Sequence, residues 1–160
     1  MATGKSTLSR ALGKRLGYPV VDKDDFSDVL MNQVEGYGPL AYGAMFSVSR
    51  SLLEQGFSVI CDSPLRGQVG YLNVKRIADE TGAELRVIVC TCSDKALWKE
   101  RLETRTRRPA HTLKTWGDFE RYKERALKDF DYSIAAPSIQ IDALNPLDNN
   151  VDAIIAWLKG

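Results

Sequence analysis

The 160-residue sequence has one histidine, three cysteines and no long apolar run. So few cysteines, odd in number, exclude a disulfide framework and fit reduced thiols. No stretch approaches the ~20 apolar residues that a membrane-spanning helix needs. The first residues carry no signal-peptide pattern. We therefore expect a cytoplasmic protein that uses no membrane, folded as a single domain over residues 1–160.

The sequence also lacks a strong net charge. Its formal value is +1, which indicates no particular partner. The distribution is uneven, because Lys99–Lys128 holds ten basic and five acidic residues, which makes this segment +5 and the rest −4. A local cationic zone suits nucleotide phosphates or a polynucleotide backbone. A solvated helix face explains residues 119–128 equally well.

A phosphate-loop motif is present only in its second half. The full pattern is G-x-x-x-x-G-K-[ST], in which backbone N–H groups hold phosphates, the lysine reaches the β- and γ-phosphates and the hydroxyl ligates Mg²⁺. Gly4, Lys5 and Ser6 fill its last three positions. The first glycine and the strand that leads into such a loop would fall before Met1, so we expect both to be missing.

The residues after this motif favour a helix that starts at the loop. Apolar residues recur at helical spacing within 7–16, and Gly17 supplies a stop. A glycine turn that leads into a helix N-terminus is what phosphate binding requires, because unpaired N–H groups and the positive end of the helix dipole meet there.

Further along, strand-like and helical patterns alternate, which predicts an α/β fold with a doubly wound parallel sheet. The predicted strands are 18–22, 57–62, 84–92 and 138–142, and the predicted helices are 7–16, 42–55, 69–81, 94–105, 119–130 and 150–158. Cys61, Cys90 and Cys92 fall in the strands, where we expect core thiols rather than a metal pair. We expect a turn at 36–39 and an Arg- and Pro-containing covering flap, the lid, over about 106–117.

Two predicted strands run into acidic residues. Val20-Val21 leads to Asp22, Lys23, Asp24 and Asp25, and the second strand ends at Asp62. Ligands of open α/β sheets bind beyond the carboxyl ends of the strands. We favour functional roles for Asp24 and Asp62, with helix capping as the alternative, and we assign the capping role to Asp25 and Ser63.

Four aromatic or ionisable residues are less specific. Tyr37, Tyr42 and Phe46 suit an acceptor pocket or helix packing alike. His111 lies in the basic lid, where we expect a surface residue rather than a catalyst.

Together these motifs, from about Gly4 to Leu158, resemble the small P-loop kinases. The resemblance is to the polynucleotide-kinase and chloramphenicol-phosphotransferase groups and to AAA-family ATPase domains of this type. It implies ATP and Mg²⁺ as cofactors and transfer of the γ-phosphate to a hydroxyl of a small molecule, with a polynucleotide acceptor as a subcase. It implies no obligate protein partner.

The resemblance also assigns roles. The nucleotide would be held by the loop residues Thr3, Gly4, Lys5, Ser6 and Thr7. Lys5 would bind the β- and γ-phosphates, Ser6 and Asp62 the Mg²⁺, and Asp24 would accept the acceptor's proton. Arg101 and Arg105 would steady the transferring phosphoryl group or stack on adenine. Two alternatives stay open: a nucleotide-binding ATPase or accessory module without transfer, and an N-terminally truncated inactive form.

Overall fold

The computed structural model describes residues 2–65, 67–109, 111–126 and 132–160. Within them, one or two helices separate successive short strands. The elements in chain order are α1 (Lys5–Leu16), β1 (Val20–Asp22), α2 (Lys23–Leu30), α3 (Tyr37–Glu54), β2 (Ile60–Asp62), α4 (Gly67–Thr81), β3 (Val87–Thr91), α5 (Lys95–Thr104), α6 (Trp116–Ala126), β4 (Ser138–Asp142) and α7 (Leu147–Lys159).

The strands pair two by two, and both pairs are parallel. β1 pairs with β2, which places Asp22 opposite Asp62, and β3 pairs with β4. Among the described residues, no strand joins the two pairs. The predicted parallel α/β class is confirmed. The sheet divides between β2 and β3.

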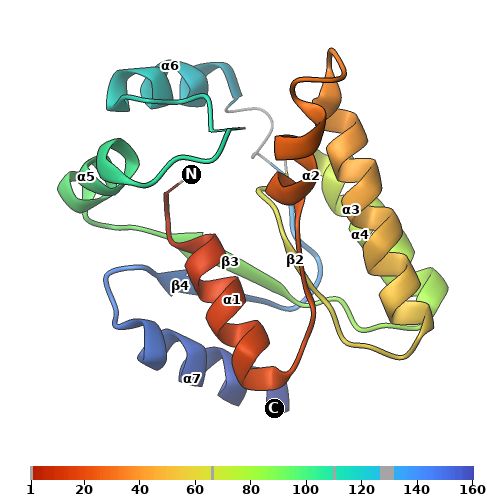
Figure 1. The fold of residues 1–160 in the computed structure, drawn as a ribbon. Coiled ribbons are helices and arrows are strands. Elements are labelled where there is room, and N and C mark those ends of the chain that lie inside the picture. The colour runs from red at the N-terminus through yellow and green to blue at the C-terminus, as the bar shows by residue number, and fades with distance from the viewer. Residues whose placement is uncertain (1, 66, 110, 127–131) are drawn as a thin grey trace.

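Helices flank these strands on more than one side. Figure 1 shows α1 and α7 together beside β3 and β4, while α3 and α4 lie side by side next to β1 and β2. Helices α5 and α6 form a separate layer near the N-terminus. No helix in the described part of the chain is long and apolar enough to cross a membrane.

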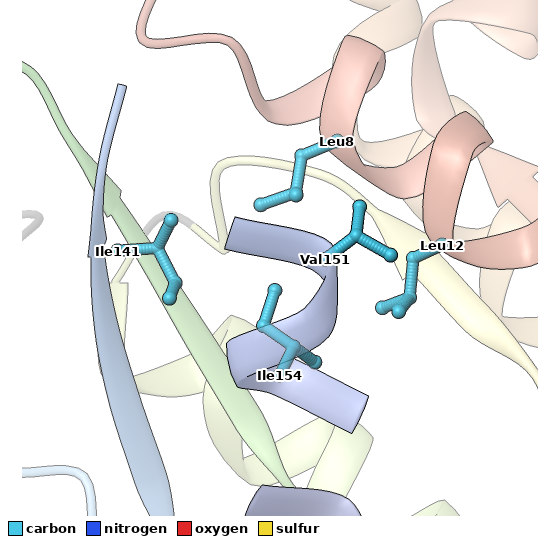
Figure 2. Packing of buried hydrophobic residues seen from close by; sticks show 5 residues of the cluster. All are labelled: Leu8, Leu12, Ile141, Val151 and Ile154. Atoms are coloured by element: carbon cyan, nitrogen blue, oxygen red, sulfur yellow. The ribbon is translucent and has the colours of Figure 1, made fainter. Parts of the chain in front are cut away.

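The best-packed part of the core joins three elements. Leu8 and Leu12 of α1, Ile141 of β4, and Val151 and Ile154 of α7 form one buried cluster, and Figure 2 shows their side chains pointing toward one another. The apolar spacing in α1 and α7 follows the helical repeat, which directs one stripe of each helix inward. This packing anchors α1, whose first turn carries the phosphate-loop motif.

Gly13 explains how α1 and β1 come so close. A Cβ atom at this position would lie 2.5 Å from Cγ2 of Val20 and 2.9 Å from the carbonyl oxygen of Tyr18. A glycine inside a helix weakens that helix. Here it permits the tight return of the chain that brings β1 alongside the phosphate loop.

Several local predictions were wrong. Residues 23–30 form helix α2, which the acidic run did not suggest, and Asp22 rather than Asp25 caps it by accepting a hydrogen bond from the Asp24 amide (2.8 Å). The predicted turn at 36–39 is instead the start of α3, with Gly36 as its N-cap. Proline is tolerated there because the first helical turn lacks intrahelical partners for its N–H groups.

Two further predictions have mixed outcomes. Cys92 is buried as expected, Cys90 is half-buried, but Cys61 is exposed. Ser63 accepts a hydrogen bond from the amide of Leu65 at 3.3 Å, two residues before α4 starts. The last part of the predicted 119–130 helix, residues 127–130, lies outside the described residues.

Candidate functional site

A cavity of about 890 Å³ lies at the carboxyl ends of the strands. It is lined by the phosphate-loop segment, by strand-end and α2 acids, by α3 tyrosines and by residues of α5, the lid and the β4–α7 connection. All the site residues predicted from the sequence line it, namely Thr3, Gly4, Lys5, Ser6, Thr7, Asp24, Asp62, Arg101 and Arg105. The fold thus gathers in one place residues spread over a hundred positions.

The N-terminus of α1 opens into this cavity without a side-chain cap. Gly4 adopts a left-handed conformation (φ 76°), and no side chain accepts from the first-turn amides. Ala2 also has a positive φ of 52°, a conformation that is uncommon for a residue with a Cβ and is found at functional sites. Uncapped amides at the positive end of the helix dipole form an anion-binding site.

Asp62 contacts the second turn of the same helix. It is 6% exposed, and its Oδ2 accepts a hydrogen bond from the Ser9 hydroxyl at 2.9 Å. Ser9 Oγ also lies 3.2 Å from the carbonyl oxygen of Ser6. A hydroxyl and a carboxylate this near to a phosphate site are the hard oxygen ligands that Mg²⁺ prefers, so Ser6 and Asp62 fit the magnesium site implied by the resemblance.

Asp22 and Asp24 differ in place and in environment. Asp22 is the acid at the end of β1, beside Asp62, whereas Asp24 lies in the first turn of α2. The strand ends at Asp22, as the predicted strand 18–22 does, and Asp24 follows it on α2. Both carboxylates line the cavity.

Asp24 is held by two basic groups. Lys23 Nζ lies 2.6 Å from Oδ1, and His111 Nε2 lies 3.2 Å from Oδ2. Burial acts to raise the pKa of Asp24, but the hydrogen bond and charge of Lys23 and the contact with His111 outweigh it, and the pKa is lowered. Asp24 is therefore ionised at neutral pH and available as a proton acceptor.

His111 is the residue that sequence reasoning most clearly missed. We expected a surface histidine, but its side chain is only 18% exposed. Its Nδ1 accepts a hydrogen bond from the amide of Arg108 at 3.2 Å, so neutral His111 carries its proton on Nε2, facing Asp24. Burial, followed by the charge of Arg105, lowers the pKa of His111 despite the opposing effect of Asp24.

Arg108 joins the lid to α2 through three carboxylates. Its guanidinium lies 3.0 Å from Asp22, 2.7 Å from Asp25 and 2.6 Å from Asp28. Burial opposes the charge, but these acids raise the pKa of Arg108. The pKa of Asp22 is nevertheless raised, first by burial and also by repulsion from Asp62 and Asp24. The three acids therefore stabilise the charged form of Arg108, whereas the charged form of Asp22 stays disfavoured by burial and by its acidic neighbours.

Arg101 and Arg105 lie at the end of α5, on another side of the cavity. Arg101 Nη1 donates to the carbonyl oxygen of Ala143 at 3.1 Å, which fixes the side chain against the β4–α7 connection. Arg105 Nε is buried without a hydrogen-bond partner among the described residues. Burial and the nearby charge of Arg107 lower the pKa of Arg105, and an anionic ligand would satisfy this guanidinium.

The three aromatic candidates line two different cavities. Tyr37 and Tyr42 line the cavity, and the Lys23 ammonium lies 5.8 Å from the centre of the Tyr42 ring. Phe46 packs against Tyr42, with ring centroids 5.9 Å apart, and lines a different cavity. No three His, Cys, Asp or Glu side chains of the described residues group as a metal site, Cys90 and Cys92 included.

The fold and this cavity define a protein of the P-loop α/β class. The chain belongs to the AAA domain family, whose profile matches residues 1–137. No curated protein matches the sequence.

Three solved structures have the same fold. The first is a candidate kinase of Chloroflexus aurantiacus, 24% identical over 98% of this chain and 91% of that one, with a TM-score of 0.79. A gluconokinase of Sinorhizobium meliloti is 15% identical over 99% and 87%, with a TM-score of 0.63. The shikimate kinase of Aquifex aeolicus is 18% identical over 100% and 92%, with a TM-score of 0.61. At these identities the likeness shows the P-loop kinase fold alone.

Proposed function

We propose that the chain is an ATP-dependent kinase that transfers the γ-phosphoryl group to a hydroxyl of a small molecule. The observation that carries this proposal is the position of an ionised Asp24 in the same cavity as the uncapped N-terminus of α1 and Lys5. The names of the solved relatives, a gluconokinase and a shikimate kinase among them, support the reaction class.

Phosphoryl transfer needs positioning and charge neutralisation more than covalent chemistry. The amides of the first turn of α1 and the Lys5 ammonium would bind the phosphates, and Arg101 and Arg105 would approach from another side of the cavity. Ser6 and Asp62 would hold the magnesium ion, which supplies charge neutralisation when bound. The donors of this site therefore surround the place where negative charge develops.

The acceptor hydroxyl would bind between α2 and the α3 tyrosines. Its oxygen forms a bond to the γ-phosphorus while the bond from that phosphorus to the bridging oxygen breaks, and ADP leaves. The hydroxyl proton passes to the carboxylate of Asp24. Lys23 and His111 orient this carboxylate, and a lid held against α2 would exclude water and so favour transfer over hydrolysis.

The first test measures nucleotide binding. Calorimetric titration with Mg-ATP should show binding to the chain, and Lys5→Met should weaken it at least tenfold because the phosphate charge loses its cation. Lys14→Met is the matched control, since Lys14 lies exposed on the same helix. The proposal is contradicted if the unchanged chain does not bind Mg-ATP, or if both variants lose affinity for Mg-ATP to the same extent.

The second test measures transfer. Hydroxyl acceptors, sugars and short oligonucleotides among them, are screened for acceptor-dependent ADP formation, and Asp24→Asn should reduce the rate at least 100-fold. Asp79→Asn is the control, because Asp79 is exposed on α4 and does not line the cavity. Hydrolysis that is independent of any acceptor and of Asp24 would instead indicate an ATPase or an accessory module.

A further inference from the structure

The lid is closed at its base by contacts between α5 and α6. Arg107 Nη2 donates hydrogen bonds to the carbonyl oxygens of Glu103 at 3.0 Å and Lys114 at 2.8 Å. The carboxylate of Glu103 accepts from the amide of Trp116 at 3.0 Å, and the Trp116 ring packs edge-on against Trp98 of α5, with centroids 5.5 Å apart. These contacts join the two ends of the lid, so its shape is defined where the chain leaves α5 and enters α6.

Arg108 fixes the lid to α2 rather than to a phosphate. Its three guanidinium nitrogens each donate to a different carboxylate, Nε to Asp28, Nη1 to Asp22 and Nη2 to Asp25. A guanidinium committed to three acids is not available to nucleotide phosphates. Arg108 does not line the cavity, whereas Arg105 does. The structure thus separates the two lid arginines, since Arg105 can meet a ligand and Arg108 holds the lid.

His111 is held at both ring nitrogens, and one of its partners is Arg108 itself. Nδ1 accepts a hydrogen bond from the Arg108 amide at 3.2 Å, and Nε2 lies 3.2 Å from Oδ2 of Asp24. To take up a proton, His111 would have to give up its bond to Arg108, because a protonated Nδ1 is a donor. His111 is therefore suited to orient a neighbouring base and not to act as one.

The two oxygens of Asp24 are held by different parts of the fold. Oδ1 is paired with Lys23 at 2.6 Å, the residue directly before it on α2, and this contact does not depend on the lid. Oδ2 is paired with His111, which the lid supplies. The torsion that rotates a carboxylate about its Cβ–Cγ bond is broad. One partner therefore leaves the plane of the carboxylate poorly defined, and two partners on separate elements define it.

We propose that His111 is a positioning residue for Asp24 and that the hold of Arg108 on α2 keeps it in place, so that phosphoryl transfer requires the closed lid. The inference rests on the proposed function, in which Asp24 accepts the proton of the acceptor hydroxyl. Each carboxylate oxygen has a second lone pair, so Asp24 can receive that proton while Lys23 and His111 hold it. When the lid opens, His111 leaves with it and the carboxylate loses one of its two supports. Bound ATP would then meet no aligned base while water has access to the cavity.

Steady-state kinetics test the role of His111, with the acceptor that gives the highest rate in the hydroxyl-acceptor screen. His111→Leu keeps a side chain of similar bulk without a donor. It should lower kcat at least tenfold and leave the KM for ATP unchanged, because the phosphate-binding residues stay in place. His111→Gln should restore kcat to within about threefold of the unchanged chain, since its amide can donate to Oδ2 of Asp24. Lys114→Gln is the control, because Lys114 is exposed on the same lid and does not line the cavity.

NMR of the imidazole nitrogens tests the link to Arg108 without any acceptor. His111 is the one histidine in the sequence, so its two nitrogen-15 signals are unambiguous. At a pH where the ring is neutral, they should show one tautomer, protonated on Nε2. Arg108→Ala should move both signals toward the averaged values of a histidine in water. Asp28→Asn, which weakens one of the three contacts of Arg108, should move them in the same direction by less.

The kinetics of the double variant test the same link. Arg108→Ala combined with His111→Leu should lose little more kcat than either substitution alone, because both act through the contact with Asp24. Losses that add in the double variant, or imidazole signals that stay unchanged in Arg108→Ala, would show that Arg108 does not set the position of His111.

The outcomes separate the positioning role from the function on which it rests. No transfer by the unchanged chain to any acceptor would overturn the proposed function and this inference together. Transfer that is unaffected in His111→Leu, or reduced equally in His111→Leu and His111→Gln, would overturn the positioning role alone.

Discussion

The guanidinium of Arg108 lies 3.0 Å from the carboxylate of Asp22, across 86 residues of sequence. Asp22 ends β1 and caps α2, and Arg108 belongs to the lid. The same guanidinium reaches Asp25 and Asp28. The Arg108 side chain therefore links the lid to α2, the helix that carries the candidate base, and the position of the lid depends on these contacts.

Removing this tie should destabilise the protein. Arg108→Ala leaves three carboxylates close together without their shared cation, and an unsatisfied charged group of this kind costs about 1–3 kcal/mol. Urea denaturation measures the free energy of unfolding. Arg107→Ala is the control, because within the described residues Arg107 donates to the carbonyl oxygens of Glu103 and Lys114 and to no carboxylate. Equal losses in the two variants would show that the three carboxylates around Arg108 play no special part.

The buried cluster of α1, β4 and α7 should be sensitive to a loss of volume. Ile154 is a member of this cluster and is 0% exposed. Ile154→Ala should therefore lower the free energy of unfolding by about 2–5 kcal/mol, through lost burial and the cavity left behind. Ile155 is only partly buried, and Ile155→Ala should cost clearly less. Thermal and urea unfolding of both variants check the difference, and a reversed order would mean that the packing in Figure 2 is wrong.

Replacing Asp22 by asparagine should increase stability at neutral pH. The pKa of Asp22 is raised, first by burial, from a reference of 3.8. A carboxyl with a raised folded-state pKa is disfavoured as an ion, so its ionisation costs stability once the pH exceeds the unfolded value. Asparagine removes that cost and keeps the helix cap.

The midpoint of thermal unfolding, followed against pH, checks this. Asp22→Asn should unfold at a higher temperature than the unchanged chain at pH 7, and the difference should vanish below about pH 3.8. Asp22→Ala, which also loses the cap, should fall below Asp22→Asn at every pH. A lower midpoint for Asp22→Asn at pH 7 would show that the Arg108 contact outweighs burial and repulsion.

Local patterns predicted most of the secondary structure, and β4 was predicted with its bounds, Ser138–Asp142. The glycine motif also placed α1 correctly, to within two residues. Helix α2 was missed because its first turn is a run of acids directly after a strand, and the start of α3 because glycine and proline within residues 36–39 suggested a turn. Both helices are held by contacts outside their own sequence, since they pack against each other.

Some residues of the candidate site could likewise be predicted from local sequence patterns, and others could not. Gly4, Lys5 and Ser6 are recognisable because a local motif encodes their geometry, and the acids could be placed because strand ends share one edge of a sheet. The contact of His111 with Asp24 spans 87 residues, and no periodic pattern in the sequence indicates it. A basic segment rich in arginine predicts an anionic neighbour, but nothing local shows that the carboxylates of Asp22, Asp25 and Asp28 are that neighbour.

His111 allows a direct measurement, because it is the one histidine in the sequence. Its pKa is lowered from a reference of 6.5, first by burial and then by the charge of Arg105, while Asp24 raises it. A depressed histidine pKa means that the neutral form is favoured in the folded state. His111 therefore contributes stability above pH 6.5 that is lost as the pH falls through the folded-state pKa.

An NMR titration of the imidazole protons should give a pKa below 6.5. Asp24→Asn removes the group that stabilises the imidazolium and should lower this pKa further, whereas Arg105→Gln removes a repelling charge and should raise it. Because the two substitutions shift the pKa in opposite directions, a general loosening of the lid cannot imitate both. A value at or above 6.5 in the unchanged chain, or a rise in Asp24→Asn, would mean that His111 does not lie between Arg105 and Asp24 in solution.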